Sequence, residues 1–77
     1  MGSISVAAAF GEVLRDLRQR AGLSQEALAG AAEVDRTYVS LLERGLRQPT
    51  LETLFRLAGA LGASPTTMVS RTAGLIG

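Results

Sequence analysis

Apolar residues recur along the chain at steps of three and four positions, which is the spacing of one face of an α-helix. The first such face is formed by Phe10, Leu14, Leu17 and Ala21. It predicts a helix over about residues 8–20, which Gly22 ends because glycine readily adopts the positive φ of a helix end. Apolar and polar positions alternate nowhere over the length of a strand, so the pattern favours an all-α fold.

The next two predicted helices are separated by a short turn. Ser24 is placed to cap the second helix and Asp35 the third, because short oxygen-bearing side chains accept hydrogen bonds from first-turn N–H groups. Gly45 provides the exit from the third helix. A helix of about eight residues, a turn of three or four and a helix of about ten have the geometry of a helix-turn-helix. The outward face of the third helix is formed by Arg36, Thr37, Tyr38, Ser40, Leu41 and Arg44.

The last part of the chain predicts one longer helix and one short one. Thr50 is placed to cap the fourth helix, and Gly62 ends it. The buried face of this helix is predicted to consist of Leu51, Leu54, Leu57, Ala58 and Leu61. Ser64-Pro65 then opens a final helical turn, since proline is favoured at the first helical position.

The chain as a whole predicts a single small domain. Its 77 residues contain no internal repeat and no shift in composition that would mark a linker. The segment 70–77 shows no clear period. We therefore expect one compact five-helix domain over residues 1–77, with a core over about 8–69, flexible N-terminal residues and a short C-terminal tail.

The composition excludes several classes of protein. Because the chain has no cysteine and no histidine, it is not a disulfide scaffold, a zinc finger or a Ser–His hydrolase. Its seven acidic residues are scattered, so we expect no enzyme, no metal site and no cofactor. The net charge is only +1, but all eight basic residues are arginine, which suits bidentate recognition of phosphates and bases.

No membrane role is expected. The longest charge-free stretch, Leu57 to Ser70, falls short of the roughly 20 apolar residues that a spanning helix needs. The N-terminal residues lack the basic start of a secretory signal, so we expect a cytoplasmic protein. A chain of this length has little room for an effector pocket beside a binding surface, and we therefore expect no small-molecule ligand.

Four blocks of sequence fall in a telling order: LSQEALA at 23–29, VDRTYVS at 34–40, ERG at 43–45 and PTLETL at 49–54. Together they resemble the phage-repressor/Cro-like helix-turn-helix family, also called the xenobiotic-response-element type. The resemblance covers about residues 10–69 and is strongest to small stand-alone regulators such as restriction–modification controller proteins. It implies a lambda-repressor-like DNA-binding domain that acts as a transcription regulator or repressor.

The resemblance also implies how double-stranded DNA is held. The recognition helix, at about residues 35–44, lies in the major groove, where Arg36 is placed to bind a guanine through two hydrogen bonds. Gln25 is expected to hold a phosphate, and Leu41 either contacts a thymine methyl group or is simply an exposed leucine. The full set of residues expected to contact DNA is Gln25, Arg36, Thr37, Tyr38, Ser40, Leu41, Arg44, Arg47 and Thr50.

Two further positions concern structure rather than contact. Arg18 and Glu43 match an ion pair that relatives bury between the first and third helices, although the two residues could also be independent surface charges. Glu33 stands in the turn where relatives usually have glycine. If the backbone there has positive φ, the non-glycine residue is strained by roughly 1–2 kcal/mol.

A dimer is expected because one short domain cannot bury all of its C-terminal apolar residues. The residues expected to mediate dimerisation are Met68, Val69, Leu75 and Ile76. Two recognition helices about 34 Å apart would then read a roughly palindromic operator. The alternative is an antitoxin or adaptor module whose main partner is another protein, and Tyr38 and Leu41 would suit such a surface.

Overall fold

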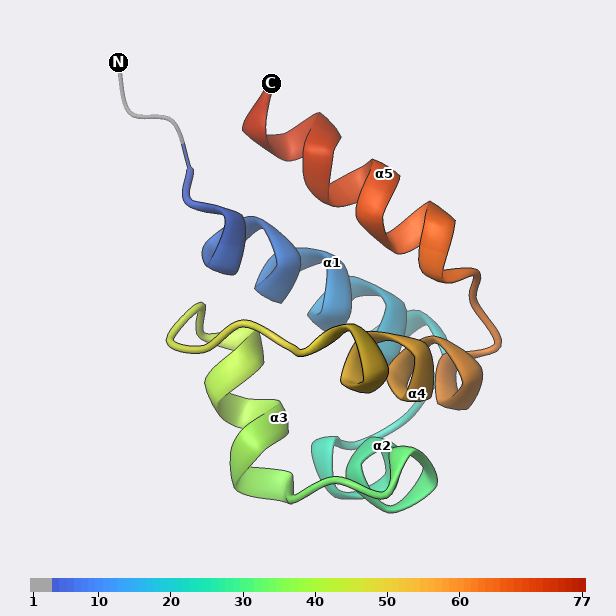
Figure 1. Ribbon diagram of the computed structural model, residues 1–77. Helices are drawn as coiled ribbons and strands as arrows, with labels where there is room; N and C mark the ends of the chain where they lie inside the picture. The colour runs from blue at the N-terminus through green and yellow to red at the C-terminus, as the bar shows by residue number, and fades with distance from the viewer. Residues whose placement is uncertain (1–3) are drawn as a thin grey trace.

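A computed structural model describes residues 4–77, and within this range the chain is all-α, without strands (Figure 1). Its five helices are α1 (Val6–Arg20), α2 (Gln25–Ala32), α3 (Arg36–Glu43), α4 (Leu51–Leu61) and α5 (Pro65–Ile76). The all-α, five-helix fold predicted from the sequence is therefore confirmed for the described part of the chain.

Side-chain caps begin four of these helices. Ser24 and Thr50 each accept a hydrogen bond from a first-turn N–H group, as predicted, and Ser5 and Ser64 do the same for α1 and α5. Asp35 occupies the N-cap position of α3, but its side chain accepts no hydrogen bond there. The predicted start of α3 is therefore correct, whereas the capping bond predicted for Asp35 is wrong.

The first helix begins earlier than the apolar pattern predicts. Its first residue is Val6 rather than a residue near position 8, because the cap comes from Ser5. Residues 1–3, which belong to the N-terminal segment expected to be flexible, lie outside the described residues.

The last helix is also longer than predicted, because α5 continues to Ile76 and takes in most of the expected C-terminal tail. Its second half contains the buried Thr72, whose hydroxyl is satisfied within α5 because it donates a hydrogen bond to the carbonyl oxygen of Met68 at 2.8 Å. The side chain of Arg71 reaches Asp16 on α1. Residues 70–77 have no apolar periodicity, so the sequence predicted a tail there, but burial of Thr72 and the ion pair of Arg71 support a helix instead.

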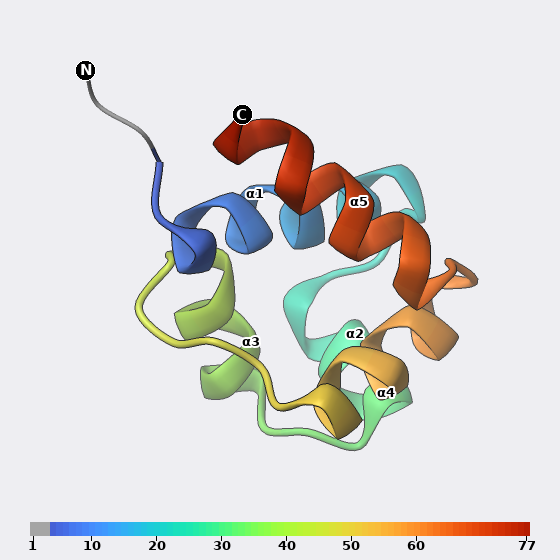
Figure 2. The same cartoon turned by 45° about the horizontal axis from the view of Figure 1, so that its top comes forward.

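The core lies where α1 packs on α3 and α5, and where α2 packs on α3 and α4. Figure 2 shows α5 lying alongside α1, with α2 next to α4. The larger side chains that are fully buried are Val13, Leu14, Leu28, Val39, Leu42, Leu57 and Met68. Leu51 departs from the predicted face of α4, since it is 73% exposed rather than buried.

A glycine brings α1 against the end of α3. Gly11 is buried, and a Cβ atom at this position would lie 2.5 Å from the carbonyl oxygen of Leu42 and 2.7 Å from that of Glu43. Any side chain would therefore push the two helices apart. The close approach fixes α3 relative to α1, and so determines how the rest of α3 is presented to solvent.

Candidate nucleic-acid interface

Helices α2 and α3 are joined by a three-residue turn, Glu33 to Asp35. Glu33 has φ 59° and ψ 44°, the left-handed conformation, and its N–H group donates to carbonyl oxygens of α2. This is the position where glycine was the expected residue, and strain of roughly 1–2 kcal/mol is the consequence of glutamate there. Val39 and Leu42 anchor α3 in the core. The predicted helix-turn-helix is thus formed.

The start of α3 is open to solvent. Arg36 and Thr37 are both exposed in its first turn, and neither side chain makes a hydrogen bond to another of residues 4–77. Ser40 and Leu41 lie further along the helix and are half-buried. The first turn of α3 therefore offers two exposed side chains with free hydrogen-bonding groups.

Tyr38 has a structural contact in addition to the DNA contact expected of it. Its ring packs partly against the core, and its hydroxyl donates a hydrogen bond to the carbonyl oxygen of Gln48 at 3.3 Å. The bond ties α3 to the loop of residues 44–50 that leads into α4. It therefore holds Arg44 and Arg47, both exposed on that loop, in a defined place relative to α3.

Thr50 ends this loop and already has two hydrogen bonds. Its hydroxyl oxygen accepts from the backbone N–H of Thr53 at 3.1 Å, and its hydroxyl group contacts the Thr53 hydroxyl at 2.9 Å. The side chain remains exposed, but its first role is to cap α4.

The arginines divide into two groups according to their partners. Five of the eight form ion pairs with a carboxylate: Arg15, Arg18, Arg20, Arg56 and Arg71. Arg36, Arg44 and Arg47 form none with any of the described residues, 4–77. These three lie on α3 and the loop after it, where they form a cluster of arginines without an ion-pair partner. Such a cluster is the electrostatic footprint of a surface that binds phosphates.

Glu43, at the end of α3, is the centre of a buried polar network. Its side chain is fully buried, and it accepts hydrogen bonds from Arg18 Nε at 2.5 Å and from Arg18 Nη2 at 3.0 Å. Arg18 also donates to the carbonyl oxygen of Leu23. Burial alone would raise the pKa of Glu43, but the hydrogen bonds from Arg18 and Gln25 outweigh it and hold the pKa below its ordinary value. The structure thus joins Arg18 and Glu43 rather than leaving two independent surface charges.

Gln25, the first residue of α2, belongs to the same network. Its amide Nε2 donates to Glu43 Oε1 at 3.0 Å. One N–H of the amide is used in this bond, which leaves the other for a phosphate. The half-buried Gln25 is therefore oriented by α3 before any DNA arrives.

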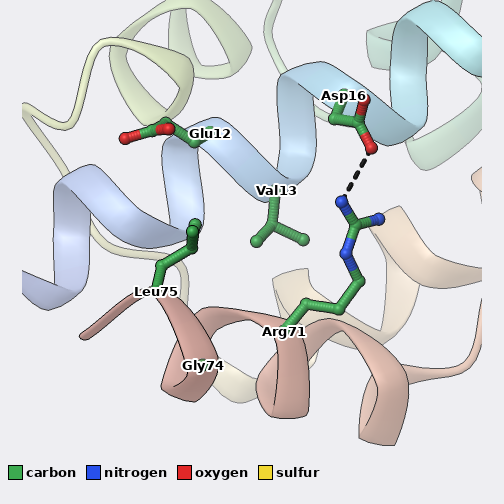
Figure 3. Close-up of a pocket in the computed structure, with 6 residues that line it drawn as sticks. All are labelled: Glu12, Val13, Asp16, Arg71, Gly74 and Leu75. Atoms are coloured by element: carbon green, nitrogen blue, oxygen red, sulfur yellow. Dashed lines mark hydrogen bonds and ion pairs between the residues drawn. The ribbon is translucent and has the colours of Figure 1, made fainter. Parts of the chain in front are cut away.

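The four residues expected to mediate dimerisation do not share one face. Met68 is 0% exposed and packs in the core, so its assignment to an interface is wrong. Val69 lines a groove between α4 and α5, whereas Leu75 lines a separate cleft between α1 and α5 (Figure 3). Ile76 is seven residues after Val69 and so lies on the same side of α5.

The groove beside Val69 contains apolar residues that the sequence pattern did not single out as an interface. Leu51 and Phe55 on α4 are 73% and 58% exposed and line the groove together with Pro65. An adjoining hollow shares Val69 and adds Val6 from α1. We call the exposed set formed by Val6, Leu51, Phe55, Val69 and Ile76 the apolar face. One signal for it was present in the sequence, since Phe55 is an apolar position outside the predicted buried face of α4, whereas Leu51 was assigned to that face.

The cleft between α1 and α5 contains an ion pair that sequence reasoning missed (Figure 3). Arg71 Nη2 lies 2.7 Å from Asp16 Oδ2, and Arg20 Nε lies 3.0 Å from the same oxygen. The hydrogen bonds from Arg71 and Arg20 hold the pKa of Asp16 below its ordinary value. Asp16 and Arg71 are 55 positions apart, so no local pattern could have paired them.

Two kinds of feature are absent from residues 4–77. No group of three or more histidine, cysteine, aspartate or glutamate residues in this range is arranged to hold a metal ion. No helix among these residues combines the length and the apolar character that crossing a membrane requires.

Comparison with known families shows that residues 9–70 match a helix-turn-helix domain. Among individual proteins, the HTH-type transcriptional regulator DdrOP3 of Deinococcus deserti is 51% identical over 51 residues, or 66% of this chain. The aligned part makes up only 40% of that regulator, so the chain spans less than half of its length.

Two solved structures extend the comparison to the fold. The restriction-modification controller protein C.AhdI from Aeromonas hydrophila has 44% identity and a TM-score of 0.79, covering 80% of this chain and 94% of that protein. The controller protein C.Esp1396I, solved as a tetramer in complex with its natural 35 base-pair operator, has 27% identity and a TM-score of 0.83, covering 95% and 96%. All three proteins carry the names of regulators or controllers, and none is named as an enzyme.

Proposed function

The chain belongs to the helix-turn-helix domain family, of the xenobiotic-response-element type, and we propose that it regulates transcription by binding a specific double-stranded DNA sequence as a dimer. The observation that carries the proposal is the division of the arginines. Arg36, Arg44 and Arg47 form no ion pair within residues 4–77, and all three lie on α3 or the loop that follows it. A regulator of this kind works on genomic DNA, so we expect it to act in the cytoplasm.

In the proposed complex, α3 lies in the major groove and presents its exposed first turn to the bases. Arg36 has the length and the free N–H groups to bind guanine O6 and N7 together, a contact worth roughly 1–3 kcal/mol of discrimination. Thr37 lies beside it. Ser40 and Leu41, further along the helix and half-buried, are placed at the edge of this contact.

Arg44 and Arg47 are proposed to bind the phosphate backbone. Such contacts fix the register and orientation of the protein but carry no sequence information. The hydrogen bond from Tyr38 to Gln48 supports this assignment, because it holds the loop with Arg44 and Arg47 against α3. Gln25, oriented by Glu43, adds a further phosphate contact at the start of α2, and the exposed Thr50 lies at the end of the same loop.

A second copy of the chain is proposed to cover the apolar face. Leu51, Phe55 and Val69 are each more than half exposed, and solvent-exposed apolar clusters of this kind mark interaction surfaces. An interface made of the same patch on both copies has two-fold symmetry. Two recognition helices related in this way would read half-sites about one helical turn, or 34 Å, apart.

Selection from a pool of randomised duplexes at near-physiological salt tests the proposal. We expect enrichment of a two-fold-symmetric site with half-sites about one turn apart. Arg36→Ala should abolish the enrichment, while Arg56→Ala, which changes an arginine paired with Glu52 outside the cluster, should leave it unchanged. If the wild-type protein enriches no sequence and shows only salt-sensitive background binding, the proposal is wrong and a protein-interaction module becomes the better interpretation.

A further inference from the structure

The carboxylate of Glu43 is shared unequally by two arginines of α1. Arg18 donates two hydrogen bonds to it and Gln25 donates a third. Arg15 Nε lies 3.6 Å from Glu43 Oε1, close enough for an ion pair but too far for a hydrogen bond. The Arg15 side chain is 56% exposed, whereas that of Arg18 is 12% exposed.

It follows that the single charge of Glu43 cannot neutralise both Arg15 and Arg18. Two guanidinium groups face one carboxylate, so the cluster of Arg15, Arg18 and Glu43 carries a net charge of about +1. The two-bond contact from Arg18 already satisfies the carboxylate. The N–H donors of Arg15 therefore remain available to a ligand on the solvent side.

The position of Arg15 beside Gln25 indicates which ligand this would be. Both side chains approach the same oxygen, Glu43 Oε1, at 3.6 Å and 3.0 Å, which places the two nitrogens less than about 7 Å apart. A phosphate group has oxygens enough to accept from a guanidinium and an amide together. We propose that Arg15 is a further contact to the DNA backbone, on α1 and outside the helix-turn-helix. The inference rests on the proposed function of the chain.

Arg20 provides a matched control on the same helix. It is 74% exposed and, like Arg15, shares a carboxylate with a second arginine, since Asp16 pairs with both Arg20 and Arg71. Its cluster joins α1 to α5, and none of α2, α3 or the loop 44–50 takes part in it. If only the loss of positive charge mattered, Arg15→Ala and Arg20→Ala would weaken DNA binding equally. If Arg15 contacts a phosphate, only Arg15→Ala would weaken it.

The experiment measures operator affinity against salt concentration for the wild type, Arg15→Ala, Arg15→Gln and Arg20→Ala, using the duplex obtained by selection. Log affinity falls linearly with log salt, and each phosphate contact that is lost makes this slope shallower by about 0.9. We expect both Arg15 variants to lower the slope by about that amount per half-site, and Arg20→Ala to leave it unchanged. Base preference should stay as in the wild type, because a backbone contact weakens binding to all sequences alike.

Thermal unfolding of each variant is measured alongside. Arg15→Gln retains a polar side chain and leaves Arg18 on Glu43, so its unfolding midpoint should match that of the wild type. A wild-type slope in folded Arg15→Ala and Arg15→Gln would overturn the inference. Equal reductions in Arg15→Ala and Arg20→Ala would overturn it as well. Absence of specific binding by the wild type would instead overturn the proposed function, and the inference with it.

Discussion

The hydroxyl of Tyr38, on α3, donates a hydrogen bond to the carbonyl oxygen of Gln48, near the end of the loop that carries Arg44 and Arg47. A residue of the predicted recognition helix thereby sets the position of the residues proposed to hold the backbone. The helix proposed to read bases and the loop proposed to bind the backbone are thus linked by one hydrogen bond of 3.3 Å.

Removal of this hydroxyl should loosen the loop without altering the bases that are read. For Tyr38→Phe we expect a loss of about 0.5–1.5 kcal/mol in the free energy of unfolding, the net contribution of one hydrogen bond. Operator affinity should fall while base preference is retained. Urea unfolding and a repeat of the duplex selection check both points. A changed base preference would show that the hydroxyl itself contacts a base.

The buried pair of Arg18 and Glu43 makes a prediction about stability. Arg18→Met leaves the buried carboxylate without its main partner, and loss of one partner of such a pair typically costs about 3–5 kcal/mol. The double variant Arg18→Met/Glu43→Leu removes both charges and should recover much of the loss. Urea unfolding measures both. Equal destabilisation by the single and double variants would contradict the pairing.

The same pair determines how stability depends on pH. Because the pKa of Glu43 is lower in the folded protein than in the unfolded chain, ionised Glu43 stabilises the fold. This contribution is complete above the unfolded pKa of about 4.3 and is lost as pH falls through the folded value. Asp16, whose pKa is also lowered, acts in the same direction. The thermal unfolding midpoint should therefore decrease as the pH is lowered below about 4.3. In Glu43→Gln this decrease should be smaller.

Gly11 makes a prediction about packing. A methyl group there would meet the carbonyl oxygens of Leu42 and Glu43 at 2.5 and 2.7 Å, and backbone atoms cannot yield as a flexible side chain can. We expect Gly11→Ala to destabilise the fold by about 1–3 kcal/mol or more. Gly59→Ala, in α4 with open space around it, should instead stabilise by roughly 0.5–1 kcal/mol. Thermal unfolding of the two variants checks the contrast.

The apolar face makes a prediction about assembly. Phe55→Asp should abolish the dimer while leaving the helical content unchanged, because Phe55 is 58% exposed and contributes little to the core. Leu75→Asp is the control, since Leu75 lines the separate cleft between α1 and α5. Sedimentation at tens of micromolar distinguishes monomer from dimer. Loss of the dimer in Leu75→Asp alone would place the interface on the other side of α5.

Much of the fold could be read from local signals in the sequence. Ser24 and Thr50 are caps whose effect depends on their own first turn, and the left-handed backbone at Glu33 could be suspected from the glycine that relatives usually have there. The extent of α5 could not be read in this way. It depends on Met68 and Thr72 being covered by other helices, and no spacing within residues 70–77 reveals that.

In the candidate site, too, some features could be predicted from local sequence signals and others depend on contacts between distant residues. The three unpaired arginines could be proposed from the order of the helices, because all of them follow from one motif. Which of the remaining arginines are neutralised could not, since Arg71 finds its carboxylate 55 positions away on α1. The misassignment of Met68 has the same origin, because an apolar residue near a chain end can pack inward or remain exposed.

The most direct test of DNA reading by α3 compares the affinities of the wild type, Arg36→Ala and Arg44→Ala for the selected operator and for an unrelated duplex. We expect Arg36→Ala to lose about 1–3 kcal/mol of discrimination at each half-site. Arg44→Ala should weaken binding to both duplexes alike, as a backbone contact does. If Arg36→Ala discriminates between the two duplexes as well as the wild type does, α3 does not read the operator through Arg36.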